Sequence, residues 1–247
     1  MLSRQQVELG RCFAVAIIPA RGGSKGIPRK NLQMCGGMTL LERAIRTCQQ
    51  AGYLSGVFVS TEDSEIAKHA TDCGAAVIDR PAELATCNAT TVDVLLHGIK
   101  SAKVHSPVTC LVQCTAPLTT PVDIDGTIGR LLETDADCAI ACAESHDFLV
   151  RPGYDGRLRG LGYELASGLP RRQDLPTTLT IAGSVWAFNT ERFLRRKALY
   201  SENCVAYQVA RRLDIDCPDD LSLAGRLLSS CHCETMRTAH NPAYYPA

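Results

Sequence analysis

The chain contains the segment Ile17-Ile18-Pro19-Ala20-Arg21-Gly22-Gly23-Ser24-Lys25-Gly26-Ile27-Pro28-Arg29-Lys30-Asn31, which carries the clearest indication of its fold. The apolar, β-branched residues before it predict a buried strand over Phe13–Ile18. The glycines allow a close approach of the backbone to a ligand, and free N–H groups in such a turn bind anions. With four cations nearby, the segment predicts a polyphosphate-binding loop, and the alternative is a solvated basic loop.

Two common phosphate motifs do not fit this loop. A P-loop requires Gly-Lys followed by Ser or Thr, whereas Lys25 is followed by Gly26. A dinucleotide-binding fingerprint opens a helix directly, whereas Pro28 and the charged run delay the next helix to about Thr39. The loop therefore indicates a phosphate site of another kind.

Strand-like and helix-like segments alternate along the rest of the chain. The further strand candidates are Gly56–Ser60, Ala76–Ile78, Val108–Gln113, Cys138–Ala143, Ser184–Phe188 and Cys204–Val209. The helix candidates are Thr39–Ala51, Ser64–Cys73, Thr91–Ala102, Val122–Glu133, Thr190–Lys197 and Pro218–Leu228. This order predicts an α/β fold with a mostly parallel, Rossmann-like sheet and helices on both faces. Ligands of such sheets bind beyond the carboxyl ends of the strands.

The length and composition suit a single domain over residues 1–247. The alternation breaks at about residues 144–181, which predicts an inserted lobe, and residues 229–247 are expected to form a flexible tail containing Cys231-His232-Cys233. The 13 cysteines include Cys48, Cys110, Cys138 and Cys142, which lie in apolar segments and are expected to be small buried hydrophobic residues.

The charge and the apolar runs limit the classes of partner. The formal net charge is zero and 45% of the residues are hydrophobic, so we expect neither nucleic acid nor an acidic membrane as a partner. No apolar run approaches the roughly 20 residues needed to cross a bilayer. Residues 1–11 lack the apolar core of a signal peptide, and we expect a cytoplasmic protein.

Four motifs in order resemble one known family. They are the loop quoted above, Arg80-Pro81-Ala82-Glu83-Leu84-Ala85, Leu111-Val112-Gln113-Cys114-Thr115-Ala116-Pro117-Leu118, and Leu213-Asp214-Ile215-Asp216. The chain is similar in these motifs to the sugar-activating cytidylyltransferases, in particular the CMP-sialic acid synthetases (acylneuraminate cytidylyltransferases). The resemblance covers about residues 14–228 and implies a homodimer in which the inserted lobe closes over the sugar site.

The nucleotide residues follow from the loop and from the resemblance. A guanidinium can fork onto phosphate oxygens, so Arg21 is expected to bind the triphosphate, with Lys30 as a point charge on the pyrophosphate that develops. The resemblance implies a catalytic contribution from both, and the remaining nucleotide-binding residues are Gly22, Gly23, Ser24, Asn31, Arg80, Ala89 and Thr91. Lys25 and Arg29 have the alternative of simple solvation. Thr90 or Thr91 could also cap the helix that follows.

Asp214 and Asp216 are the candidate metal ligands. On a strand, their spacing would put both carboxylates on one face, where Mg²⁺ is commonly held together with substrate phosphates. The family's matching pair binds the metal, which implies Mg²⁺ as the cofactor. The alternative is helix capping, which suits Asp219 and Asp220 next to Pro218.

The acceptor side matches the family less closely. The resemblance assigns Gln113, Arg172 and Trp186 to acceptor binding, but Thr119 and Ala182 depart from the family pattern. We expect transfer of CMP from CTP to a 3-deoxy-2-keto sugar acid of the sialic-acid type, with release of pyrophosphate. The alternatives are a phosphonate or another anionic acceptor, another nucleoside triphosphate, and a non-catalytic nucleotide-binding protein.

Overall fold

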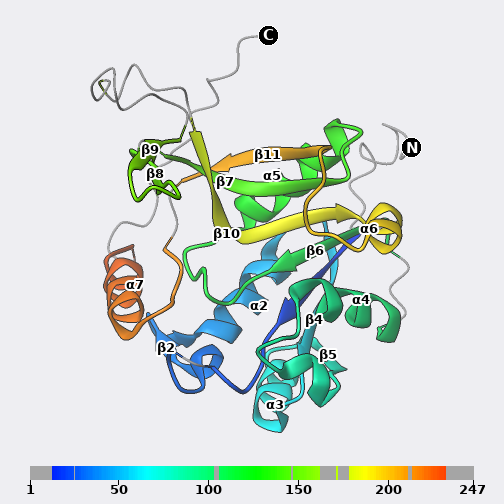
Figure 1. Cartoon of the computed structure of the whole chain (residues 1–247). Coiled ribbons are helices and arrows are strands. Elements are labelled where there is room, and N and C mark those ends of the chain that lie inside the picture. Colours follow the sequence, from blue (N-terminus) through cyan, green and yellow to red (C-terminus); the bar gives the residue numbers. More distant parts are fainter. Residues whose placement is uncertain are drawn as a thin grey trace.

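A seven-stranded sheet forms the centre of the computed structural model, which describes residues 13–24, 26–102, 106–145, 147–161, 171, 178–210 and 213–231 (Figure 1). The strand order is β11-β7-β10-β6-β1-β4-β5. The strands are β1 (Ala14–Pro19), β4 (Leu54–Thr61), β5 (Ala76–Asp79), β6 (Val108–Val112), β7 (Cys138–Ser145), β10 (Thr178–Asn189) and β11 (Cys204–Val209). The predicted α/β class is confirmed, and Lys25, Arg172 and residues 232–247 lie outside the described residues.

Strand β10 runs against its neighbours. Strand β1 pairs in parallel with β4 and β6, β4 with β5, and β7 with β11, whereas β10 is antiparallel to both β6 and β7. The opposed arrows of β6 and β10 are visible in Figure 1. Since six strands point the same way, their carboxyl ends meet at one edge of the sheet, where ligands of such folds bind.

Helices cover both faces of the sheet, as predicted. The helices are α2 (Leu40–Gln50), α3 (Ser64–Asp72), α4 (Thr91–Ser101), α5 (Pro121–Glu133), α6 (Thr190–Arg196) and α7 (Pro218–Cys231). One core cluster joins buried residues of α2, α3, α5 and α7 to the sheet, for example Leu41, Ile66 and Ile124. A second cluster joins α4 and α6 to the other face, through Leu95 and Phe193.

Side-chain caps explain where the helices begin. Thr39, Asp63, Thr90, Thr120 and Asn189 each accept a hydrogen bond from a backbone N–H in the first turn of α2 to α6, respectively. Such a cap satisfies a donor that the helix leaves unpaired. The capping alternative for Thr90 is therefore confirmed, and Thr91 is the first residue of α4.

Short elements complete the fold. The 3-10 helix η1 (Lys30–Leu32) and the hairpin of β2 (Met34–Cys35) and β3 (Met38–Thr39) separate the loop from α2. Another 3-10 turn, η2 (Ala82–Ala85), follows β5. The hairpin of β8 (Val150–Pro152) and β9 (Leu158–Gly160) lies within the range of the predicted lobe.

The expectation for Cys138 is wrong in one respect. Cys138 is buried as predicted, but it forms a disulfide with Cys204, its direct partner in the pairing of β7 and β11. Neighbouring positions on paired strands bring two sulfur atoms within reach although 66 residues separate them. In the part of the chain that the structure describes, no helix is long and apolar enough to cross a membrane.

Candidate functional site

The loop predicted to bind phosphate leaves β1 at the carboxyl edge of the sheet. Ala20 N donates to Ser60 O at 2.9 Å, which continues the pairing with β4 by one residue. The side chain of Asn31 is buried and its Nδ2 donates to Arg21 O at 3.0 Å. Asn31 therefore closes the loop from its far end and fixes the backbone from which the Arg21 side chain starts.

Residues at the end of β4 hold the start of the loop. Gly22 N donates to Glu62 Oε1 at 2.8 Å. A Cβ atom added to Gly22 would lie 2.4 Å from Asp63 Oδ2, whereas one added to Gly23 would meet nothing within 4 Å. The backbone at Gly22 is thus pressed against Asp63, and the space beside Gly23 is open to a ligand.

Arg29 anchors the other end of the loop, so its alternative as a solvated residue is wrong. Its backbone is left-handed at φ 52°, and its guanidinium donates to Asp63 Oδ2 at 2.7 Å and to Asp63 Oδ1 at 3.0 Å. A third donation reaches Glu65 Oε2 at 2.6 Å. The hydrogen bond from Arg29 lowers the pKa of Asp63, and that carboxylate also caps α3.

Arg80 is buried at the base of the site. Only 4% of its surface is exposed, its N–H donates to Thr61 O, and its guanidinium donates to Glu62 Oε2 at 2.8 Å. Burial lowers the pKa of Arg80, and the charge of Glu62 opposes that shift. Among the described residues, Arg80 Nε has no hydrogen-bond partner. Arg80 Nε is thus enclosed by the protein, and the ion pair with Glu62 holds the guanidinium in place.

Arg21 and Ala89 flank the same region. Arg21 lies close enough to Arg80 that its charge contributes to lowering the pKa of Arg80. Its guanidinium donates to Thr86 O at 3.3 Å, in the turn that follows η2. Ala89 is half-buried and directly precedes the cap of α4. The residues predicted for the nucleotide thus converge on the space between the loop and the start of α4.

Lys30 joins the loop to the predicted metal ligands. Its Nζ donates to Ile215 O at 2.5 Å and lies 3.5 Å from Asp216 Oδ1. A Cβ atom added to Gly26 would lie 2.4 Å from Asp216 O, so the loop backbone touches the same segment. Two segments 185 residues apart in sequence therefore form one wall of the site.

The aspartate pair does not lie on a strand, contrary to the geometry expected for it. Residues 213–216 follow β11 as an irregular segment, in which Ile215 is fully buried and its N–H donates to Thr115 O at 2.8 Å. Because Ile215 points inward, Asp214 and Asp216 are both exposed on either side of it. Their proximity to Lys30 is retained although the strand is not.

The surroundings of Asp214 suit a cation. Partial desolvation raises its pKa, the charge of Asp216 adds to that shift, and Lys30 opposes it. A Cβ atom on Gly183 would lie 3.2 Å from Asp214 Oδ2, so the protein packs closely on one side of this carboxylate. Two oxygen-donor carboxylates beside a phosphate loop match the ligand chemistry of Mg²⁺.

Asp220 has the capping role that the alternative assigned to it. Its Oδ2 accepts from Asp216 N at 2.9 Å and from Cys217 N at 2.8 Å. Pro218 is the first residue of α7, as expected for a proline in the first turn. The cap of α7 therefore fixes the backbone of Asp216 through its N–H. The Asp216 carboxylate takes no part in this cap.

The two described residues that were predicted to bind the acceptor, Gln113 and Trp186, lie in different surroundings. Gln113 follows β6, is half-buried, and its N–H donates to Ser184 O at 3.1 Å. Trp186 is only 5% exposed and packs in the core cluster beneath α4 and α6. Its Nε1 has no hydrogen-bond partner among the described residues. Gln113 thus lies at the carboxyl end of β6, whereas Trp186, which was expected in the acceptor pocket, is a core residue of β10.

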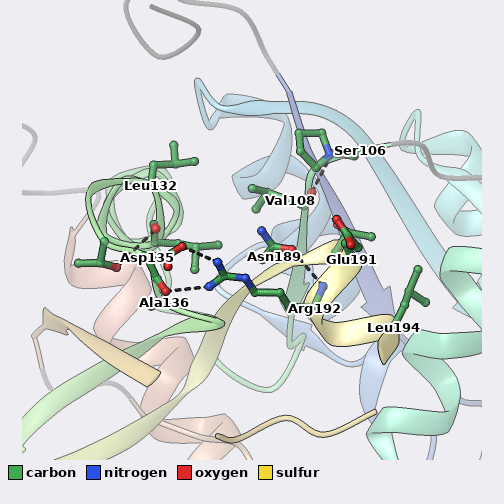
Figure 2. Close-up of a pocket in the computed structure, with 13 residues that line it drawn as sticks. Ser106, Val108, Leu132, Asp135, Ala136, Asn189, Glu191, Arg192 and Leu194 are labelled. Carbon is green, nitrogen blue, oxygen red and sulfur yellow. Dashed lines mark hydrogen bonds and ion pairs between the residues drawn. The ribbon is translucent and has the colours of Figure 1, made fainter. Parts of the chain in front are cut away.

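A cavity lies at the opposite end of the sheet. It has a volume of about 730 Å³ and is lined in part by Ser106, Val108, Ala136 and Asn189 (Figure 2). Val108 begins β6 and Asn189 ends the antiparallel β10, so these residues mark the amino ends of the parallel strands. Arg192 points into this cavity but donates to Asp135 O at 2.7 Å and pairs with the Asp135 carboxylate. Its charge is thus compensated, and the cavity is separate from the predicted site.

The described residues contain one further group of possible metal ligands, Glu42, His69 and Cys73. Arg46 pairs with Glu42 at 2.8 Å, and His69 Nε2 lies 2.8 Å from Thr39 Oγ1. These partners already supply the charge and hydrogen bonding of the group, so we assign no metal to it.

Sequence reasoning missed several polar residues of the site. Glu62 connects Gly22 to Arg80, and Ser60 and Ser184 have buried hydroxyls that lack partners among the described residues. Glu62 and Ser60 lie at the carboxyl end of β4, the position at which ligands of such sheets bind. That rule could have found them, whereas the direction of β10, which brings Ser184 to this edge, could not be read from the alternation.

Sequence comparison confirms the resemblance expected from the motifs. A family model described as cytidylyltransferase matches residues 15–157. The N-acylneuraminate cytidylyltransferase of Streptococcus agalactiae (serotype III, strain NEM316) is 30% identical over 214 residues, which is 83% of this chain and 51% of the relative. N-acylneuraminate cytidylyltransferase A of Danio rerio is 30% identical over 82% of this chain and 49% of its own. The chain thus spans about half the length of the curated relatives it matches.

Solved structures share the fold. A CMP:2-keto-3-deoxy-manno-octonic acid synthetase complexed with CTP superimposes with a TM-score of 0.68 at 19% identity, over 88% of this chain and 98% of that one. A 4-diphosphocytidyl-2C-methyl-D-erythritol synthase from Anaerococcus prevotii gives a TM-score of 0.66 at 14% identity, over 89% and 99% of the two chains.

Proposed function

Because the chain belongs to the cytidylyltransferase family, we propose that it transfers CMP from CTP to a 3-deoxy-2-keto sugar acid of the sialic-acid type. The anomeric hydroxyl of the acceptor attacks the α-phosphorus, and the bond to the departing pyrophosphate breaks. The observation that carries this proposal is the wall formed by the loop, Lys30 and the Asp214–Asp216 segment. It brings cations for the phosphates next to carboxylates for a metal.

The loop residues divide the binding of the nucleotide among them. Gly22 N–H is already bound to Glu62, so the phosphates face Gly23, Ser24 and the cation of Arg21. Lys30 lies beside the carboxylates and stabilises the negative charge that grows on the pyrophosphate. Positioning and charge stabilisation supply most of the rate in this kind of chemistry.

The base end of the proposed site lies between Arg80 and the start of α4. Arg80 is buried and pairs with Glu62, Arg21 reaches Thr86 O, and the half-buried Ala89 directly precedes the cap of α4. A cytosine edge has acceptors for backbone N–H groups and a donor for backbone carbonyls. We therefore assign Arg80, Ala89 and Thr91 to the cytosine end of CTP.

Mg²⁺ is the cofactor that we propose, held by Asp214 and Asp216. When bound, it neutralises phosphate oxygens and lowers their repulsion toward the attacking hydroxyl. Without it, the two carboxylates would repel the triphosphate, with Lys30 as the cation that offsets them. Lys30 and the carboxylates together orient the leaving pyrophosphate.

The acceptor is a keto sugar acid in our proposal because two groups of proteins converge on that chemistry. The names of the relatives specify N-acylneuraminate, and the first structural neighbour acts on a 2-keto-3-deoxy acid by its title. Gln113 lies at the edge where such an acceptor would enter. Arg172, which we assign to the acceptor carboxylate, lies outside the described residues.

A homodimer is also part of the proposal. Apolar side chains are exposed on the β8–β9 hairpin and on the first half of β10, including Val150, Leu158 and Ile181. Where such side chains form one surface, they are typical of an interface between proteins. Light scattering after gel filtration should give twice the mass of the chain, and a monomer would contradict this assignment.

Pyrophosphate release tests the proposed activity. We expect release with CTP and Mg²⁺ in the presence of N-acetylneuraminate, its deaminated analogue or a shorter keto acid, and far less with UTP, ATP or GTP. A panel that includes phosphonates tests the alternative acceptor class. CTP binding without release for any acceptor would instead favour a non-catalytic nucleotide-binding protein.

A further inference from the structure

The carboxylate of Glu62 connects two groups that we assign to opposite ends of the nucleotide. Its Oε1 accepts from Gly22 N at 2.8 Å, and its Oε2 accepts from the Arg80 guanidinium at 2.8 Å. Gly22 belongs to the phosphate loop, and Arg80 belongs to the cytosine end. One side chain therefore spans the two halves of the site.

Arg80 depends on this carboxylate for its charge balance. The Arg80 side chain is 3% exposed and Glu62 is 22% exposed in the ion pair. A buried cation requires a nearby anion and good hydrogen-bond geometry. Among the described residues, Glu62 is the acid that pairs with Arg80. The orientation of the Arg80 guanidinium thus follows from Glu62.

The loop depends on the same stretch of chain. Glu62 holds Gly22, and the next residue, Asp63, holds Arg29 at the other end of the loop. Asp63 is itself fixed because it caps α3. The two acids that follow β4 therefore hold both ends of the loop on a rigid element, and Glu62 alone also reaches the cytosine end.

We propose that Glu62 is a positioning residue that fixes the phosphate loop and Arg80 as one unit, so that cytosine and triphosphate are bound together. This inference rests on the proposed function and adds to it a residue that acts through Gly22 and Arg80. The length of the Glu62 side chain matters as well as its charge. An aspartate at this position would keep the charge near Arg80, but it is one methylene too short to reach both donors.

Calorimetric titration with CTP and Mg²⁺, without an acceptor, tests the proposal. We expect Glu62→Asp and Glu62→Gln each to raise the Kd for CTP at least tenfold. Glu62→Asp should recover most of the melting temperature that Glu62→Gln loses, but not the affinity. Glu62→Gln placed in an Arg80→Gln background should add less than threefold, because the pair acts as a unit. Asp72→Asn, an exposed charge removal at the end of α3, should stay within twofold of the wild type.

A second measurement covers variants that fold poorly. Amide exchange of a peptide containing Gly22 should be faster in Glu62→Asp than in the wild type, because the Gly22 N–H has lost its acceptor. Wild-type affinity for CTP in Glu62→Asp, or independent effects of the Glu62 and Arg80 substitutions, would overturn the proposal and leave the proposed function standing. A wild-type protein that binds no CTP would instead overturn the proposed function, and this inference with it.

Discussion

Gly26→Ala tests whether the contact between the phosphate loop and the Asp216 segment is required for activity. A Cβ atom there would lie 2.4 Å from Asp216 O, whereas ordinary contacts begin at 3.4 Å. Gly26→Ala therefore requires the loop and the Asp216 segment to move apart by about 1 Å, the difference between these distances. The atom it meets belongs to the backbone, which α7 and Ile215 hold in place. Rotation of a flexible side chain cannot relieve the contact.

The expected losses follow from that displacement. A misplacement of about 1 Å in an active site can lower the rate about 100-fold, so we expect kcat/KM for CTP to fall by about that factor. Overpacking of this size costs about 1–3 kcal/mol of the free energy of unfolding. For a chain of about this length, each kcal/mol lowers the Tm by about 2–4 °C. The assays are pyrophosphate release and thermal unfolding of the same preparation.

Two other glycines serve as controls for Gly26→Ala. Gly23→Ala should leave the Tm unchanged, since its Cβ would meet nothing within 4 Å. Any rise in the KM of this variant for CTP would then reflect contact between the added methyl group and the bound nucleotide. Gly129→Ala lies inside α5, where its Cβ would be 4.0 Å from Tyr53, and it should keep full activity. Activity of Gly26→Ala within threefold of the wild type would refute the contact between the loop and the Asp216 segment as a requirement for catalysis.

The remaining predictions concern charges of the site. Asp214→Asn and Asp216→Asn should abolish pyrophosphate release and remove the dependence of CTP binding on Mg²⁺. Little change in Tm is expected, because Asp216 is exposed and because desolvation already disfavours the charged form of Asp214. Activity retained in both variants would contradict the assignment of the metal to these carboxylates. Arg21→Ala should weaken CTP more than CMP by a charge-assisted bond of about 1.5–3 kcal/mol, and equal losses in titrations of the two would place Arg21 away from the outer phosphates. The pKa of Asp63 is lowered in the folded state, so its contribution to stability is complete above its unfolded pKa of about 3.9 and disappears as the pH falls through the folded pKa. Urea unfolding should thus show the wild type losing its advantage over Asp63→Asn below about pH 4, and a constant difference would contradict the lowered pKa.

The sheet and helices could be predicted because their signals are local. Periodic apolar residues such as Leu41, Ala44 and Ile45 mark a helix from its own sequence. The direction of β10 could not be predicted in this way. It depends on where the chain goes between Ser145 and Thr178, and an apolar strand has the same composition in either direction. The Cys138–Cys204 disulfide could not be predicted for the same reason. It depends on the register between β7 and β11, and its two cysteines are 66 residues apart.

The candidate site could be predicted in its parts but not in its connections. Arg21, Lys30 and Asp214 follow from the order of their motifs, and the structure brings these segments to one edge. Glu62 did not stand out because a single acid after a strand has no pattern of its own. For Arg29, the sequence leaves simple solvation as an alternative, since only the folded chain places Asp63 opposite it. Partners distant in sequence decide which charges are free for a ligand.

The pairing of Ser145 with Thr178 has a consequence for how such a protein can diversify. The chain leaves the sheet at the end of β7 and returns at the start of β10, and these two positions are direct neighbours. The segment between them therefore begins and ends at adjacent positions, on the edge of the sheet where we propose the site. Lengthening a segment whose ends already meet adds little entropy cost, about 0.6 kcal/mol for each doubling. Insertions and replacements there can therefore alter this segment while β1, β4 and β5, which carry the phosphate loop and Arg80, keep their geometry.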